Sequence, residues 1–278
     1  FLSVLPASVR YAISHTIARW NFERYMRGKL GHFYLQVDHG PAGKKELIMK
    51  TAILNESDVR TKTDANFYFN SGYEQMLSWL QILERHGFNV RTASAIMELG
   101  CGSARLIRHL RCIDGINLVG SDLSSEMVEW CSRNIPGIEF HQNNLKPPLE
   151  FADDDTFDLV FAGSVFTHIP IETQGLWIRE LNRVIRPGGF LLCDVLGRYH
   201  QERMLGPDEM SQLRQNGAFT LTAIDKRASL STKIIGSWDV FLLRGEVLKA
   251  FGSSFVVLDY LPRPLDLLVL QKVRKKEE

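Results

Sequence analysis

Cysteine is scarce in this 278-residue sequence, and its four cysteines form neither a C-x-x-C pair nor a zinc-like spacing. A disulfide scaffold and a structural zinc site are therefore not expected, and we predict reduced thiols in a cytoplasmic protein that binds no metal. No apolar run reaches the roughly 18 residues of a membrane-spanning helix. Neither sign of charge dominates, since the sequence has 33 lysines and arginines and 32 aspartates and glutamates. A nucleic-acid partner is not expected either.

The composition is that of a globular protein with one large domain and a smaller part, since 45% of its residues are hydrophobic and 23% charged. We predict a helical N-terminal extension or cap over 1–72 and a globular domain over 73–278. Within the extension, apolar residues at helical spacing and interspersed arginines predict an amphipathic helix over 7–29. It is expected to pack on the domain, and contact with a membrane surface or a protein partner is the alternative. No pattern indicates an oligomeric state.

After residue 91, short apolar segments alternate with helical patterns. Strands are predicted over 95–99, 117–121, 138–142, 158–162, 189–195, 255–261 and 267–273. Helices are predicted over 73–86, 103–111, 124–134, 172–185 and 244–251. Such alternation indicates an α/β fold with a doubly wound parallel sheet, and the short connection between the last two strands makes them an antiparallel hairpin.

The segment 96–110, IMELGCGSARLIRHL, runs from an apolar strand through two glycines into a helical pattern. Gly100 and Gly102 permit a sharp turn and let a ligand approach the backbone without meeting a Cβ atom. In a doubly wound sheet this turn lies where ligands bind, and the following helix would direct free N–H groups there. Glu98 precedes the turn, and its carboxylate would repel a pyrophosphate and attract an ammonium group. We therefore predict a ligand that carries a positive charge.

This segment, MELGCGSA, and the later VGSDLS lie 22 residues apart, counted from Gly100 to Asp122. Together they resemble the cofactor signature of the class I S-adenosylmethionine-dependent methyltransferases that act on small molecules. The resemblance covers about residues 68–272. It implies a Rossmann-like, seven-stranded, mostly parallel sheet with a C-terminal antiparallel hairpin. It also implies S-adenosylmethionine as the cofactor and S-adenosylhomocysteine as the product. Ala104 replaces the third glycine of the family's motif.

The resemblance also assigns parts of the cofactor to residues of this chain. The methionine end is expected at Glu98, Gly100 and Gly102, the ribose at Asp122, the adenine at Leu123, Met127, Asn144 and Leu145, and the sulfonium at Ala162, Gly163 and Phe166. Further expected contacts are Cys101, Asn143 and Tyr68, the last from N-terminal residues folded over the cofactor. Asn144 stands where the family has an acid, and its amide oxygen can still accept a hydrogen bond.

Methyl transfer from a sulfonium is a direct displacement, so the enzyme mainly aligns the reactants and excludes water. A hydroxyl acceptor must also lose a proton, which a base can take. His168, in the segment SVFTHIP after the fourth strand, is the candidate base, and the alternative is a structural histidine that caps or packs against the next helix. Asp194 and His200, after the fifth strand, are weaker candidates. The acidic run 153–155 is expected to be a solvated turn.

Residues 206–243 follow the fifth strand and are predicted to be an insertion that covers the acceptor site. We therefore expect a methyltransferase that moves a methyl group to an oxygen, or a nitrogen, of a small molecule, natural product or sugar. A catalytically idle subunit that binds S-adenosylmethionine and regulates a partner is the alternative. A nicotinamide-dependent reductase is disfavoured by Glu98 and by the late hairpin.

Overall fold

The computed structural model of the chain describes residues 65–222 and 238–273, with side chains from residue 71 onward. The predicted helix over 7–29, the middle of the predicted insertion and the final residues 274–278 lie outside this part. Within the described ranges, none of the helices combines the length and the apolar content needed to cross a bilayer.

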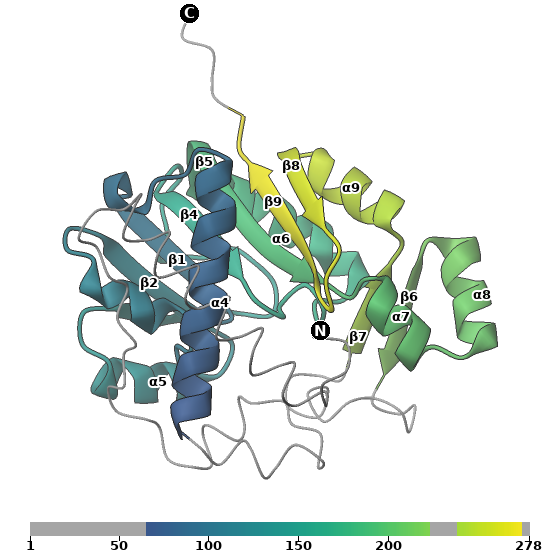
Figure 1. The fold of residues 1–278 in the computed structure, drawn as a ribbon, viewed down its shortest axis with the longest axis horizontal. Helices are drawn as coiled ribbons and strands as arrows, with labels where there is room; N and C mark the ends of the chain where they lie inside the picture. Colours follow the sequence, from purple (N-terminus) through teal and green to yellow (C-terminus); the bar gives the residue numbers. More distant parts are fainter. Residues whose placement is uncertain (1–64, 223–237, 274–278) are drawn as a thin grey trace, which may run out of the picture.

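Seven strands form a single sheet in the order β3-β2-β1-β4-β5-β9-β8 (Figure 1). Five neighbours are parallel: β1 (Ala95–Leu99), β2 (Asn117–Asp122), β3 (Glu139–Gln142), β4 (Phe157–Ala162) and β5 (Ile185–Val195). The last two, β8 (Val256–Leu261) and β9 (Asp266–Gln271), form an antiparallel hairpin that pairs with β5 through β9. The predicted sheet and hairpin are confirmed. The strand order reverses between β1 and β4, which is where ligands bind in such sheets.

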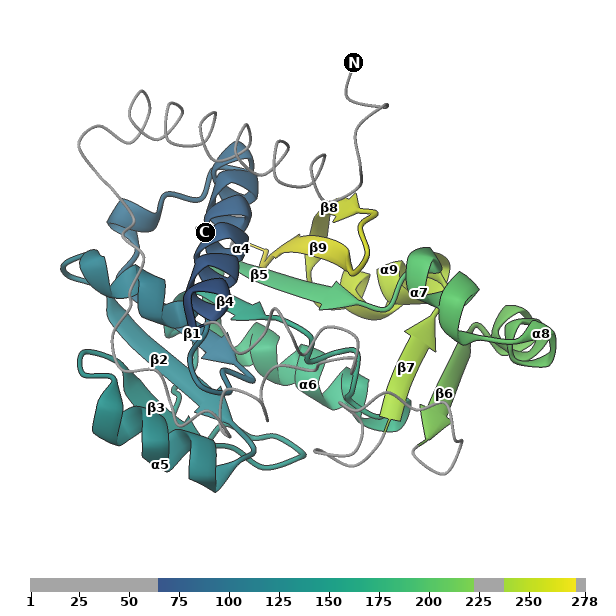
Figure 2. The same cartoon turned by 60° about the horizontal axis from the view of Figure 1, so that its bottom comes forward.

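Helices cover both faces of this sheet, and each face has its own apolar core (Figures 1 and 2). On one face lie α4 (Ala65–Arg85), η4 (Ile107–Cys112) and α5 (Ser125–Asn134), and on the other lie α6 (Ile171–Val184) and α9 (Arg244–Gly252). A short helix, η3 (Val90–Thr92), precedes β1. Within β1, Ile96 packs in the first core and Met97 in the second. This alternation follows from the two-residue period of a strand.

The structure corrects the element predicted over 103–111. An α-helix was expected from Ser103, but residues 103–106 form turns and a 3-10 helix, η4, begins only at Ile107. Ala104 has a φ of 58°, in the left-handed region, so the chain cannot enter a right-handed helix at this point. The free N–H groups of a regular helix N-terminus are therefore not presented at the glycine turn.

Two further boundaries differ from the prediction. Strand β5 begins at Ile185 rather than at residue 189, because the Pro-Gly-Gly segment forms an irregularity inside the strand. The pairing passes from Phe157 opposite Ile185 to Leu159 opposite Phe190, so the extra residues bulge out. Helix α4 begins before the predicted position 73 and runs across the expected boundary between the extension and the domain.

Residues 198–222 and 238–242 form a small unit to one side of the main sheet (Figures 1 and 2). It contains α7 (Arg198–Met204), α8 (Pro207–Asn216), β6 (Ala218–Thr222) and β7 (Trp238–Leu242). Strands β6 and β7 pair antiparallel, and an apolar cluster that includes Leu213, Leu221 and Phe241 packs between them and the helices. The described part of the predicted insertion 206–243 therefore packs in an apolar cluster that it shares with Leu196 and Leu205.

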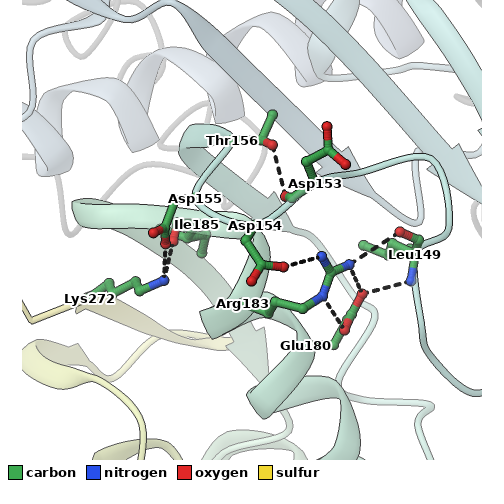
Figure 3. Close-up of polar contacts among 9 residues, drawn as sticks. All are labelled: Leu149, Asp153, Asp154, Asp155, Thr156, Glu180, Arg183, Ile185 and Lys272. Atoms are coloured by element: carbon green, nitrogen blue, oxygen red, sulfur yellow. Dashed lines mark hydrogen bonds and ion pairs between the residues drawn. The ribbon is translucent and has the colours of Figure 1, made fainter.

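The acidic run 153–155 is a turn held by basic side chains (Figure 3). Arg183 of α6 donates to Asp154 Oδ1 at 2.7 Å, and Lys272 donates to Asp155 Oδ1 at 2.5 Å. These ion pairs join the turn to α6 and to the end of β9. The described residues contain no group of three or more His, Cys, Asp or Glu side chains that could hold a metal ion.

Glu180 anchors the same region from inside α6 (Figure 3). Arg183 donates to both of its carboxylate oxygens, at 2.6 and 3.0 Å, and the Leu149 N–H donates at 2.7 Å. Burial alone would raise the pKa of the Glu180 carboxyl, but these hydrogen bonds outweigh it and hold the pKa below its usual value.

Replacing Glu180 with Gln should lower the free energy of unfolding by about 1–3 kcal/mol at pH 7, the scale of a lost charge-assisted pair. Because the folded-state pKa is depressed, the carboxylate's contribution exists above its unfolded pKa and is lost as the pH falls through the folded value. Urea unfolding of both proteins at pH 7 and pH 3 measures this. Equal differences at the two pH values would contradict it.

Glu129→Gln is the matched control. Glu129 pairs with Arg133 one turn along α5, with both side chains mostly exposed. Its loss should cost no more than about 0.5 kcal/mol.

Candidate active site

A pocket opens at the carboxyl ends of β1, β2 and β4, where the strand order reverses. Eight predicted site residues line it: Gly100, Asp122, Leu123, Asn143, Asn144, Leu145, Gly163 and His168. They come from four separate segments of the chain, so the fold brings together residues that are up to 68 positions apart in sequence.

The turn after β1 fits only glycine at its first position. Gly100 has a φ of +71°, and a Cβ atom there would lie 2.4 Å from the Val165 side chain. Asp122, at the end of β2, fastens the turn, because its Oδ2 accepts the Gly102 N–H at 2.8 Å and its Oδ1 accepts the Ser124 N–H at 2.9 Å. The carboxylate therefore sets the shape of the turn and still lines the pocket.

Glu98 lies beneath the turn rather than at its mouth. It is buried, and one carboxyl oxygen accepts the Ile107 N–H, the first of η4, at 3.0 Å. Burial raises the pKa of Glu98 to about 8, and burial also raises the pKa of Asp122. Glu98 is thus mostly protonated at neutral pH in the ligand-free protein. A positively charged ligand would offset the cost of ionising these two acids, so their placement suits a cation.

A third buried acid supports the opposite wall of the pocket. Asp194, near the end of β5, accepts the Ser164 N–H at 2.6 Å, and burial raises its pKa to about 7. Ser164 follows β4 with a φ of 57°, a left-handed conformation that costs energy for a residue with a side chain. The hydrogen bond that Ser164 donates to Asp194 therefore holds the turn that carries the predicted residues Gly163 and His168. This contact gives Asp194 a supporting role in the pocket wall.

The side of the pocket near β3 has a buried amide at its base and both an amide and an apolar side chain at its rim. Asn143 is buried and accepts from the Ser121 hydroxyl at 2.6 Å, whereas Asn144 and Leu145 are exposed. Trp177 of α6 donates its indole N–H to the Leu145 carbonyl at 3.0 Å, which fixes this loop. An amide and apolar walls could hold a flat heterocycle.

His168 lies on the turn after β4, with a side chain that is 19% exposed. Its Nδ1 is 2.8 Å from the Trp238 carbonyl oxygen on β7. A carbonyl only accepts, so Nδ1 carries a proton and the neutral ring leaves Nε2 unprotonated. His200, the weaker candidate, is held on α7, and burial lowers its pKa.

Of the other predicted contacts, those whose side chains the structure describes do not line the pocket. Phe166, expected beneath the sulfonium, is buried in the second core with its ring centroid 5.0 Å from that of Phe251. Ala162 and Cys101 are buried in the two cores, and Met127 is buried on α5. Gly102 contributes through its backbone only, and Tyr68 falls on α4 without a described side chain.

Sequence reasoning missed Leu99, Ser164, Val165, Ile169 and Trp177 as pocket residues. The first four flank predicted residues, so their proximity in sequence was a usable signal. Trp177 sits on the buried face of an amphipathic helix, and nothing in its spacing separates a pocket tryptophan from a core one.

Comparisons with known proteins agree with this geometry. Residues 97–193 match a family described as a methyltransferase domain. The chain is 30% identical over 184 residues to a fatty-acid O-methyltransferase of Mycolicibacterium smegmatis, which covers 56% of this chain and 64% of that protein. It is 33% identical over 94 residues to a demethylmenaquinone methyltransferase of Chlorobaculum parvum, with 34% and 37% covered. The chain thus spans less than two-thirds of these relatives.

A solved structure from Listeria monocytogenes, described as an S-adenosylmethionine-dependent methyltransferase, has the same fold. Its TM-score is 0.52 at 13% identity, over 71% of this chain and 98% of that one. Residues 97–193 thus match a methyltransferase domain, and the sheet has the fold of a solved S-adenosylmethionine-dependent methyltransferase. The cofactor of this methyltransferase family is S-adenosylmethionine.

The residues present fit that cofactor. The glycine turn brings the backbone to the pocket in a conformation that a Cβ atom at Gly100 would disrupt by meeting Val165. Asp122 lines the pocket, where its carboxylate could accept hydrogen bonds from a ribose. Burial raises the pKa of Glu98 and of Asp122, which favours a cationic ligand. In this chain Asp122, Asn144 and the backbone around Gly100 would hold it.

Asp122→Asn should weaken binding of S-adenosylhomocysteine by about tenfold or more, because an amide cannot replace a carboxylate that accepts hydrogen bonds on both oxygens. Isothermal titration calorimetry of both proteins gives the affinities, and thermal unfolding gives the change in stability. Unchanged affinity in a variant with a lowered melting temperature would restrict Asp122 to holding the turn.

The ionisation of Glu98 should also be visible in stability. Its folded-state pKa of about 8 lies above the usual carboxyl value, so its protonated form favours folding and this advantage is lost as the pH rises toward 8. Relative to Glu98→Gln, the wild-type unfolding free energy should fall by about 2 kcal/mol between pH 6 and pH 8. Parallel stability curves from urea unfolding would show that Glu98 is already ionised.

Proposed function

We propose that the protein transfers a methyl group from S-adenosylmethionine to an oxygen atom of a small molecule, with His168 as the base. The observation that carries the proposal is the hydrogen bond between His168 Nδ1 and the Trp238 carbonyl, 2.8 Å long, on a side chain that lines the pocket. It leaves the unprotonated Nε2 as the ring nitrogen available to a ligand.

The chain's own residues would perform three tasks. Asp122, Asn144 and the turn at Gly100 hold the cofactor, which supplies a methyl group on a positively charged sulfur. Apolar side chains around His168, including Val165 and Ile169, exclude water from the reacting atoms. His168 Nε2 accepts the proton that a hydroxyl acceptor loses, a role that typically contributes 10²–10⁴-fold to the rate.

Two observations favour oxygen over nitrogen as the accepting atom. A neutral amine needs little help from a base, so a histidine whose neutral tautomer leaves Nε2 unprotonated suits a hydroxyl better. In addition, the similar protein from Mycolicibacterium smegmatis is named as an O-methyltransferase. The folded unit formed by α8, β6 and β7 is proposed to cover the acceptor, because β7 contacts the turn that carries His168.

A methyl-transfer assay tests the proposal. The full chain is incubated with S-adenosylmethionine labelled in the methyl group and with a panel of phenols, hydroxylated fatty acids and sugars, and amines are included as a second panel. Label in a hydroxylated product supports the proposal. Label only in the amines would move the function to nitrogen, and binding of S-adenosylhomocysteine without any transfer would favour the idle regulatory subunit.

His168→Ala should lower kcat for a hydroxyl acceptor by about 10²-fold or more, while the affinity for S-adenosylhomocysteine stays within about twofold, because the base acts only on the acceptor's proton. Steady-state kinetics and calorimetry measure the two quantities. His86→Ala is the control, since His86 pairs with Asp259 at the end of α4, away from the pocket. Full activity of the His168→Ala variant would contradict the proposal that His168 is the base.

A further inference from the structure

A carboxylate from the inserted unit lies beside the same histidine nitrogen. Asp239 follows Trp238 on β7, and its Oδ1 is 3.5 Å from His168 Nδ1. The Asp239 side chain is only 3% exposed. His168 Nδ1 thus lies near two oxygens of β7, the Trp238 carbonyl with which it makes a hydrogen bond and the Asp239 carboxylate, and His168 also lines the pocket.

We propose that Asp239 is a positioning residue that orients His168 and stabilises its protonated form during methyl transfer. The inference rests on the proposed function and assigns a role to the insertion: it supplies the second member of the catalytic pair as well as a cover for the acceptor.

The position of Asp239 is fixed by the fold. The next residue, Val240, donates its N–H to the Thr167 carbonyl at 2.9 Å, so β7 is joined to the residue before His168. Asp239 also pairs with Leu221 in the β6–β7 ladder, and the neighbouring Phe241 is fully buried. Because β7 is held from both sides, the carboxylate can orient the imidazole without a large entropic cost.

The proton balance of the step is complete with the groups named. The acceptor oxygen forms a bond to the methyl carbon as the carbon–sulfur bond breaks, and the electron pair of that bond stays on sulfur. The hydroxyl proton passes to His168 Nε2, and the resulting imidazolium is balanced by the Asp239 carboxylate next to its Nδ1–H. Of the other charged groups, His200 on α7 interacts electrostatically with Asp239, and Asp122 lies on the pocket wall formed by β2.

Asp239→Asn tests the role of the charge because it keeps the shape and an oxygen acceptor. With the panel acceptor that the wild type methylates fastest, kcat should fall by about 10-fold or more, and the affinity for S-adenosylhomocysteine should stay within about twofold. Asp208→Asn, on the exposed side of α8 in the same unit, is the matched control and should match the wild type. Thermal unfolding verifies that both variants are folded.

A double-mutant cycle separates this role from a structural one. If Asp239 acts through His168, Asp239→Asn should not lower the residual rate of a His168→Ala protein any further. A further loss of the same size as in the wild type would overturn the inference, because it would show that the two residues act independently.

A second readout needs no acceptor. Diethyl pyrocarbonate acylates unprotonated imidazole nitrogens, and mass spectrometry of the peptide containing His168 gives its rate of modification at pH 8. This rate should fall about threefold or more in Asp239→Asn, since the carboxylate makes Nε2 more nucleophilic. Equal modification rates in the wild type and in Asp239→Asn, together with an unchanged kcat, would overturn the inference.

If the wild type methylates nothing in the panel, the proposed function fails. The modification rates of the two proteins then still decide the role of Asp239.

Discussion

The pocket depends on hydrogen bonds between buried carboxylates and the backbone of two turns. Asp122 accepts the Gly102 and Ser124 N–H groups, Glu98 accepts the Ile107 N–H, and Asp194 accepts the Ser164 N–H. Without these acceptors the chain would leave buried donors unsatisfied in turns that contain left-handed residues. The same carboxylates prepare the pocket for a cation, because burial makes their ionisation costly until a positive charge arrives. Structural support and ligand preference thus arise from one set of contacts.

The pocket has two walls with different origins. The wall formed by β1, β2 and the loop after β3 belongs to the sheet, and the methyltransferase family shares this architecture. The wall that carries His168 is completed by β7, from a unit that stands beside the sheet and has its own apolar core. Under the proposed function, this division separates cofactor binding on the sheet from acceptor chemistry on the added unit.

Much of the fold could be predicted from the sequence, because apolar runs separated by turns identify buried strands and because the glycine turn locates the switch point. Local conformation was harder: Ala104 follows two glycines in a helical pattern, yet its left-handed φ delays the helix until Ile107. The orientation of Phe166 could not be predicted from the sequence either, since an aromatic residue beside a strand end can face the ligand or the core. The contact of His168 with Trp238 spans 70 residues and leaves no periodic signal.

The most direct test of this account is calorimetric titration of the full chain with S-adenosylhomocysteine and, in parallel, with NADH. Buried acids around the glycine turn, with Asp122 lining the pocket, predict that the sulfur ligand binds with a micromolar or lower Kd. They predict no heat of binding for the dinucleotide, whose pyrophosphate would approach the Asp122 carboxylate. Binding of NADH, or binding of neither ligand, would contradict the claim that this pocket is built for a sulfonium cofactor.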